Sequence, residues 1–305
     1  EDTGDPGLRK AKLSYYPEIL LKKYVAIQSD IVYANRDREG EQIEKIWETC
    51  FGDEKEYIRF YMEHRMTEEN MLVIHEDGKA VSMASFLPVR YLCEGEYVDA
   101  RYVYAVATLP EYRGRGLAKR ILMFAHEHYG QPLILAPAEE SLMHYYETLG
   151  FRKAFPDTRA WMKDTLAALE WTENVDVTDM IKPLTTQEYV QIRDEKCAKE
   201  GYVRWDENAV RYAIELCEHY GGGAGAVESA EGERDILMYE KDDDTLVILE
   251  TSLGTRALQE LLPHLLKETG TSRASYGQMP GMIWLPEAME KTKISEQGYL
   301  ALTLG

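Results

Sequence analysis

Hydrophobic residues recur at helical spacing around Ile43, Ile46 and Trp47, and Gly52 stands where a helix of that pattern would end. We expect a short strand at 31–34 before this helix and a second helix over 54–65 after it. Apolar runs that follow predict strands, with EDGK and EGE as hairpin turns among them, at 71–75, 80–86, 89–93 and 97–108.

The remainder of the first half contains both helical and strand-like hydrophobic patterns. A helix is predicted after the glycine-containing turn at 113–116, because Leu117, Ile121 and Phe124 share one face. The expected elements after it are a buried strand at 132–136, a short helix at 139–148 and a strand near 151–163. This order predicts an α/β (α+β) fold, in which helices flank a mixed central sheet.

The second half repeats part of the same order. It predicts helices at 185–199 and 206–219 and strands at 222–228, 235–240 and 245–251. A leucine-rich helix is expected after them. We therefore expect an N-terminal extension (1–30), a first α/β domain (31–171) and a second, similar α/β domain (172–305). An unrelated α+β cap is the alternative for the last of these.

Composition narrows the function. The formal charge of −19 over 305 residues disfavours nucleic-acid binding, which needs a broad basic surface. It makes cationic partners easier to attract, although solubility alone is the alternative explanation of the charge. Four cysteines and seven histidines form no metal-spaced cluster, so we expect reduced thiols and no metal site. Because there is no membrane-length apolar run and no signal-peptide pattern, we expect a cytoplasmic protein without a membrane partner.

The stretch VATLPEYRGRGLAKRI (106–121) places two glycines and four cations between a strand and a helix. A helix N-terminus collects unpaired amides, and the helix dipole favours an anion there. Gly114 and Gly116 allow the main chain to approach a ligand closely. This pattern predicts a phosphate or pyrophosphate site, although a plain glycine-arginine turn is the alternative.

Two common nucleotide motifs do not fit this stretch. The P-loop pattern GxxxxGK[ST] is missing, and the GxGxxG pattern fails because Lys119 stands at the third glycine position. The strands before the loop also form a meander rather than a βαβ unit.

RGRGLA (113–118) matches the pattern Q/R-x-x-G-x-G/A and follows VATLPEY, while PAEESLMHYYETLGF (137–151) comes later in the chain. Together these segments resemble the acyl-coenzyme A loop and the final motif of the GCN5-related N-acetyltransferase (GNAT) superfamily. The order of elements in 31–163 is also similar to that of the family. The second half lacks such a loop, so the chain resembles a tandem GNAT protein with a degenerate second half.

The resemblance implies roles for particular residues. The backbone of Val106, Ala107 and Thr108 would pair with the pantetheine arm of acetyl-CoA. The pyrophosphate would be wrapped by Arg113, Gly114, Arg115, Gly116, Leu117 and Ala118. A main-chain N–H near Val106 or Ala107 would polarise the thioester carbonyl. Tyr146 matches the family's tyrosine and would act as the general acid that protonates the departing thiolate.

Several assignments stay open at this stage. Tyr146 could instead be a core aromatic, and Tyr145 is a neighbour that could be confused with it. The general base is not readable, because Glu139 and Glu140 open the last helix, where capping and the helix dipole explain them. Tyr102 and Tyr104 could line the acceptor cleft or merely pack. A chain-terminal carboxylate, as in some tandem relatives, could also enter the site.

We therefore expect an acetyl-CoA-dependent N-acetyltransferase that acts on the primary amine of a small, cationic acceptor by direct attack in a ternary complex. The alternative is a non-catalytic acyl-CoA-binding sensor or interaction module that uses the same loop. The sequence leaves open whether the chain forms a homo-oligomer.

Overall fold

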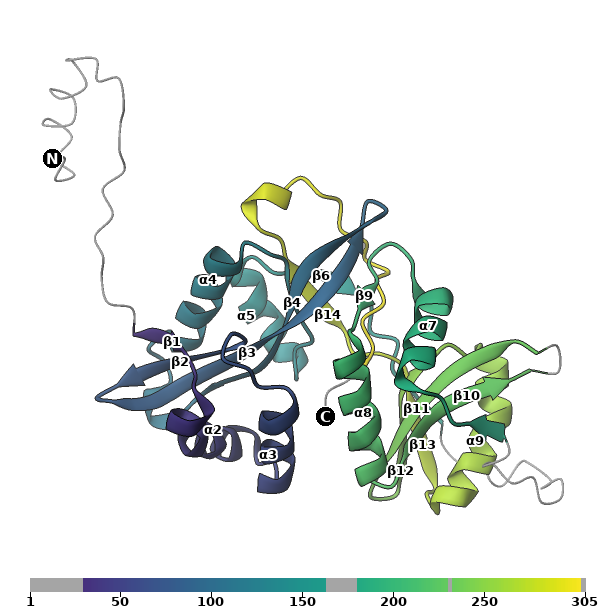
Figure 1. The fold of residues 1–305 in the computed structure, drawn as a ribbon. Coiled ribbons are helices and arrows are strands. Elements are labelled where there is room, and N and C mark those ends of the chain that lie inside the picture. Colours follow the sequence, from purple (N-terminus) through teal and green to yellow (C-terminus); the bar gives the residue numbers. More distant parts are fainter. Residues whose placement is uncertain (1–29, 163–179, 230–231, 303–305) are drawn as a thin grey trace, which may run out of the picture. The chain divides into compact units, whose positions relative to one another are not determined.

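The computed structural model describes residues 30–162, 180–229 and 232–302 (Figure 1). The predicted N-terminal extension, apart from its last residue, lies outside the described residues. So do the predicted boundary at 171/172 and the chain-terminal carboxylate. No helix of the described part is long and apolar enough to cross a membrane.

The first sheet has the strand order β1-β2-β3-β4-β5-β14-β6, and β9 pairs with β3 beside β2. Its strands are β1 (Ile31–Tyr33), β2 (Met71–Glu76), β3 (Lys79–Cys93), β4 (Glu96–Thr108), β5 (Leu133–Leu135), β6 (Arg152–Phe155), β9 (Val203–Arg204) and β14 (Gly281–Trp284). Its first four strands are antiparallel neighbours, and β5 runs parallel to β4. This arrangement confirms the predicted mixed central sheet.

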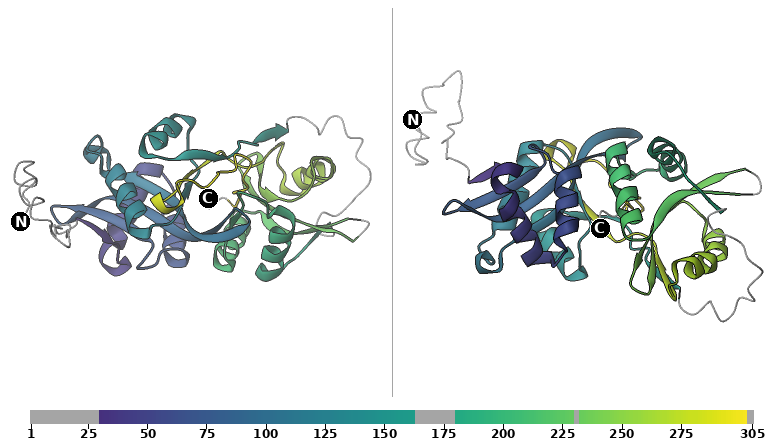
Figure 2. Two further views of the ribbon diagram at one scale, coloured as in Figure 1. Left: turned by 90° about the horizontal axis from the view of Figure 1, so that it is seen from above. Right: turned by 60° about the horizontal axis from the view of Figure 1, so that its bottom comes forward.

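Helices cover both faces of this sheet (Figures 1 and 2). They are α2 (Arg36–Phe51), α3 (Lys55–His64), α4 (Leu117–Tyr129) and α5 (Glu140–Leu149). Alternation along β2 divides the core, since Met71 and Val73 pack in the cluster with α2 and α3 while Leu72 and Ile74 pack with α4 and α5. The sheet therefore holds α4 and α5 on the face opposite α2 and α3.

One predicted pair of strands is a single strand. The segments 80–86 and 89–93 both belong to β3, which continues through Pro88. The amide of Pro88 would point to the side of β3 that faces β2 and β9. On that side, the amide of Phe86 donates to the Asn70 carbonyl and the amide of Leu92 donates to the Tyr202 carbonyl. Pro88 lies between these two contacts, where neither β2 nor β9 pairs with β3, so its missing N–H breaks no ladder bond.

The second sheet has the order β7-β13-β12-β11-β10-β8. Its strands and helices are β7 (Ala160–Met162), β8 (Ile181–Lys182), α7 (Thr186–Cys197), α8 (Glu207–His219), β10 (Gly223–Glu228), β11 (Arg234–Asp242), β12 (Thr245–Thr251), α9 (Thr255–Thr269) and β13 (Arg273–Tyr276). Two helices, an antiparallel meander, a helix and a parallel strand follow one another in both halves. That the second half is a GNAT-like domain stays a prediction.

The two sheets exchange strands across the predicted domain boundary. β7 precedes that boundary but pairs with β13 in the second sheet, while β14 pairs with β5 and β6 in the first. The hydrophobic pattern does not predict β8, β9, β13 and β14, because these strands are short. Among the described residues of the C-terminal segment, Tyr299 forms an isolated β-bridge with Tyr202.

A buried ion pair ties the second half to this C-terminal segment. Arg193 Nε lies 2.9 Å from Glu250 Oε1, and the two side chains are 1% and 0% exposed. The same guanidinium donates to the carbonyl of Leu300 at 3.0 Å. Removing one partner of such a pair leaves the other charge buried without compensation.

We expect Glu250→Ala to lower the free energy of unfolding by about 3–5 kcal/mol, as is typical when one partner of a buried pair is lost. The half-exposed pair of Asp157 and Arg159, 2.7 Å apart, is the matched control. Asp157→Ala should cost less than ~1 kcal/mol. Urea denaturation measures both values, and equal losses would contradict the structural role of Glu250.

Candidate active site

The glycine-rich loop joins the end of β4 to the start of α4 through a short 3₁₀ turn, Pro110–Tyr112. Gly114 and Gly116 have φ of 77° and 74°, in the left-handed region that favours glycine. Gly116 is the N-cap of α4 and makes no side-chain capping hydrogen bond. The first amides of α4 therefore have no side-chain cap, and that they bind an anion stays a prediction.

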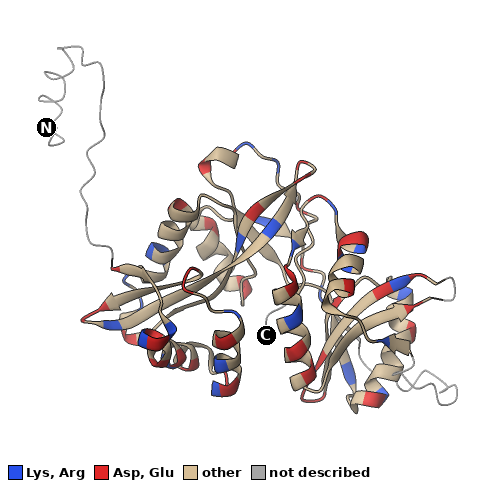
Figure 3. Ribbon diagram, viewed as in Figure 1, with Lys and Arg blue, Asp and Glu red and all other residues tan. Residues whose placement is uncertain are grey.

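Residues of this loop line a cavity of 440 Å³. It is lined by Cys50, Phe51, Val106, Ala107, Thr108, Tyr112, Arg113, Gly114, Gly116, Leu117, Ala118, Leu142, Tyr145 and Tyr146. The structure thus brings every predicted site residue except Arg115 to one cavity, which we call the cofactor cavity. Acidic positions elsewhere are spread over α2, α3, α7 and α8 (Figure 3).

Arg115 does not line the cofactor cavity. Its Nη1 donates to Glu76 Oε2 at 3.0 Å, its Nη2 donates to the Glu111 carbonyl, and its guanidinium lies over the Tyr112 ring. Its side chain therefore holds the loop against the β2–β3 turn. Arg113 instead lines the cavity and donates through Nε to the Thr108 carbonyl at 3.1 Å.

β4 separates from β5 beside this cavity. The two strands pair at Arg101–Leu133 and Tyr102–Ile134, and no pairing between them follows among the described residues. Residues 106–108 of β4 line the cavity instead. An extended ligand can add to a strand edge of this kind through main-chain hydrogen bonds, which is the predicted use of this segment.

A β-bulge lies in β4 where the strands separate. The register with β3 shifts between Met83 and Ser85, so Ala105 and Val106 together oppose Ala84. Ala105 has a φ of 50°, which for a residue with a side chain costs on the order of 1–3 kcal/mol. Bulges re-aim the backbone next to active sites. The sequence analysis missed this bulge because an alanine within a strand pattern carries no signal for it.

Tyr146 lies on α5, is 8% exposed and packs edge-to-face against Phe151. Burial and the neighbouring Tyr145 raise the pKa of Tyr146 to about 12. The phenol therefore stays protonated at neutral pH and can donate a proton. Tyr145 is half-buried and lines the cofactor cavity but not the second cavity described below. Tyr146 lines both cavities.

That second cavity, which we call the acceptor cavity, has a volume of 320 Å³. Its lining residues are Trp47, Phe51, Asp53, Val103, Tyr104, Ala105, Val106, Leu135, Ala136, Ala138, Leu142 and Tyr146. Of the two tyrosines considered for the acceptor cleft, Tyr104 lines it and Tyr102 does not. Glu139 and Glu140 line neither cavity, and Glu139 makes no capping hydrogen bond to α5.

Four residues line both cavities: Phe51, Val106, Leu142 and Tyr146. The cavities therefore meet at the bulged strand and at the predicted acid. Phe51 is 45% exposed and Leu142 is 37% exposed, which is unusual for large apolar side chains in a folded protein. A ligand in these cavities would cover that apolar surface.

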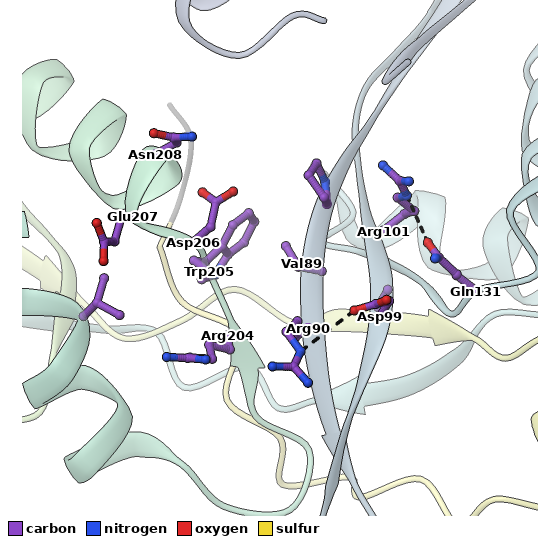
Figure 4. Close-up of a pocket in the computed structure, with 13 residues that line it drawn as sticks. Val89, Arg90, Asp99, Arg101, Gln131, Arg204, Trp205, Asp206, Glu207 and Asn208 are labelled. Carbon is purple, nitrogen blue, oxygen red and sulfur yellow. Dashed lines mark hydrogen bonds and ion pairs between the residues drawn. The ribbon is translucent and has the colours of Figure 1, made fainter. Parts of the chain in front are cut away.

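A larger cavity of 670 Å³ lies between β3, β4 and residues 204–208 (Figure 4). Its arginines already have partners. Arg90 faces Asp99, Arg101 donates to Gln131 Oε1 at 3.0 Å, and Arg204 donates to Asp194. No predicted site residue lines this cavity, so it is not part of the candidate active site.

Part of this chain is similar to known proteins. Residues 33–154 match the family described as "Acetyltransferase (GNAT) domain". Over 81 residues the chain is 32% identical to the S-alkylcysteine N-acetyltransferase of Bacillus subtilis (strain 168), an alignment that covers 24% of this chain and 44% of that protein. The chain thus matches less than half the length of this curated relative.

Solved structures extend the likeness in fold to both halves. The chain resembles a GCN5-related N-acetyltransferase from Kribbella flavida with a TM-score of 0.59 at 16% identity, covering 85% of this chain and 72% of that one. It also resembles the N-myristoyltransferase of Saccharomyces cerevisiae, solved with bound myristoyl-CoA. That match has a TM-score of 0.52 at 10% identity and covers 93% of this chain and 88% of the other.

Proposed function

We propose, from the premise that this chain belongs to the GNAT superfamily, that it transfers an acetyl group from acetyl-CoA to the primary amine of a small, cationic acceptor. One observation carries the proposal: the cofactor cavity and the acceptor cavity meet at Val106 and Tyr146. A thioester and an amine bound in these cavities would be brought together beside an amide and a phenol.

The cofactor's parts have matching features along the first cavity. Amides of the loop and of the first turn of α4 suit a pyrophosphate, and Arg113 adds a positive charge. Residues 106–108 of the separated strand suit the pantetheine arm. The fold similarity to a protein solved with myristoyl-CoA agrees with an acyl-CoA ligand.

The reaction divides between two groups of this chain. The main-chain N–H of Val106 would stabilise the negative charge that develops on the carbonyl oxygen as the amine nitrogen attacks. The new C–N bond forms as the C–S bond breaks. The Tyr146 phenol gives its proton to the sulfur, the neutral amine loses a proton to water as it attacks, and Tyr146 then regains a proton from water.

The second half is not expected to bind a second cofactor in this proposal, and none of its described residues lines either cavity. α9 begins at Gly254, whose φ of −63° differs from those of the two loop glycines. The sequence between β12 and α9 has no counterpart of RGRGLA.

Calorimetry with acetyl-CoA, followed by a thiol-release assay over a panel of primary amines, tests the proposed function. We expect one acetyl-CoA per chain and amine-dependent release of coenzyme A. Tight binding without thiol release on any amine, protein lysines included, would instead favour the non-catalytic sensor.

A further inference from the structure

We propose that Asp53 binds the ammonium group of the acceptor, and that the acceptor is a primary amine with an apolar body and no carboxylate. This inference rests on the proposed transferase function, since it concerns the acceptor cavity of that site. The sequence pattern gave Asp53 no role, because it reads as one acidic residue in a polar turn between two helices.

The local fold fixes the carboxylate of Asp53 in place. α2 ends at Gly52, whose φ of 78° turns the chain before α3 begins. Trp47, which is 1% exposed, then donates from its indole Nε1 to Asp53 Oδ2 at 2.7 Å. Such a short bond to a carboxylate is charge-assisted and orients it. The other oxygen, Oδ1, has no hydrogen-bond partner among the residues that the structure describes.

Charge complementarity identifies the group that Oδ1 would bind. Among the described residues that line the acceptor cavity, Asp53 is the one that carries a charge, and the others are apolar or aromatic. Asp53 is partly buried and lines this cavity, so a cation that enters the cavity would interact more strongly with its carboxylate than it would in bulk water. An ammonium group is the cationic form of the amine that the proposed reaction consumes, and it would lose one proton to water before its nitrogen attacks the thioester.

The same lining also argues against a carboxylate on the acceptor. The lining residues that the structure describes include no lysine, arginine or histidine that could pair with a carboxylate, and Asp53 would repel one. Trp47 and Tyr104 offer aromatic surface to an apolar body and can attract its cationic end. The cavity volume of 320 Å³ suits a small molecule. An amine such as 2-phenylethylamine fits this description, whereas L-phenylalanine adds a carboxylate to the same body.

Calorimetry of these two probes with the full chain tests the inference without requiring turnover. We expect 2-phenylethylamine to bind at least ~10-fold more tightly than L-phenylalanine. Asp53→Asn should weaken the binding of 2-phenylethylamine by at least ~10-fold, because the charge is lost while the amide oxygen can still accept from Trp47. Acetyl-CoA affinity and the unfolding midpoint should stay at their wild-type values.

Glu54→Gln is the matched control, because Glu54 is exposed, makes no capping hydrogen bond and does not line the cavity. It removes the same charge one residue away and should leave binding of the amine unchanged. Equal binding of the two probes, equal loss in both variants, or no binding of 2-phenylethylamine would overturn the role of Asp53. Asp53-dependent binding without thiol release would instead preserve this inference and contradict the proposed transferase activity.

Discussion

Gly116→Trp should reduce acetyl-CoA affinity by at least ~100-fold, equivalent to about 2.8 kcal/mol. A side chain at this position would project from the N-cap of α4 into open space, because no described residue other than its chain neighbours has a heavy atom within 4 Å of its Cβ. Because Gly116 also lines the cofactor cavity, we expect an indole there to occupy the volume proposed for the pyrophosphate. Calorimetric titration with acetyl-CoA measures the effect.

Backbone strain must be separated from steric blockage in this experiment, because Gly116 has a positive φ. Gly130 provides the matched control at the opposite end of α4, with a φ of 58° and open space around its Cβ. It does not line the cofactor cavity. Gly130→Trp should therefore bind acetyl-CoA like the wild type. Wild-type affinity in Gly116→Trp would remove the loop from the binding site.

Tyr146→Phe should lower kcat by ~100-fold or more, within the range usual for loss of a general acid, and change acetyl-CoA affinity by less than ~3-fold. The substitution removes the phenol proton donor and preserves the ring that packs on Phe151. Steady-state kinetics with an active amine gives both parameters. An unchanged kcat would mean that water or another group protonates the thiolate.

Tyr145→Phe is the control, because Tyr145 is adjacent to Tyr146 and lines the cofactor cavity but not the acceptor cavity. Its kcat should remain near that of the wild type. The raised pKa of Tyr146, about 12, also sets the pH dependence: the phenol keeps its proton as pH rises, so its ionisation should cause no loss of kcat up to pH ~10. A fall in kcat over pH 7–10 that disappears in Tyr146→Phe would contradict this.

The sequence predicted the site best where local pattern and chemistry coincide. Gly114 and Gly116 between a strand and a helix predicted an open helix N-terminus, and the structure has one there. Tyr146 could be placed near the loop through the resemblance to the family. Which arginine faces the cavity could not be predicted, because the turn between two glycines of positive φ decides it. Arg115 pairs with Glu76, far away in sequence.

Other features depend on long-range pairing that a single sequence does not encode locally. Pro88 suggests a strand break, but it lies where β3 has no partner on that edge. β14 is four residues long, and only its pairing with β5 and β6 identifies it as a central strand. The bulge at Ala105 and the cavity position of Asp53 likewise follow from tertiary contacts.

A crystal structure of the protein with bound coenzyme A tests the central claim most directly. We expect the pyrophosphate to accept hydrogen bonds from the amides between Gly114 and Ala118, and the thiol to lie between Val106 and Tyr146. A pyrophosphate bound instead in the 670 Å³ cavity near Arg90 and Arg204, or a thiol remote from Tyr146, would contradict the account.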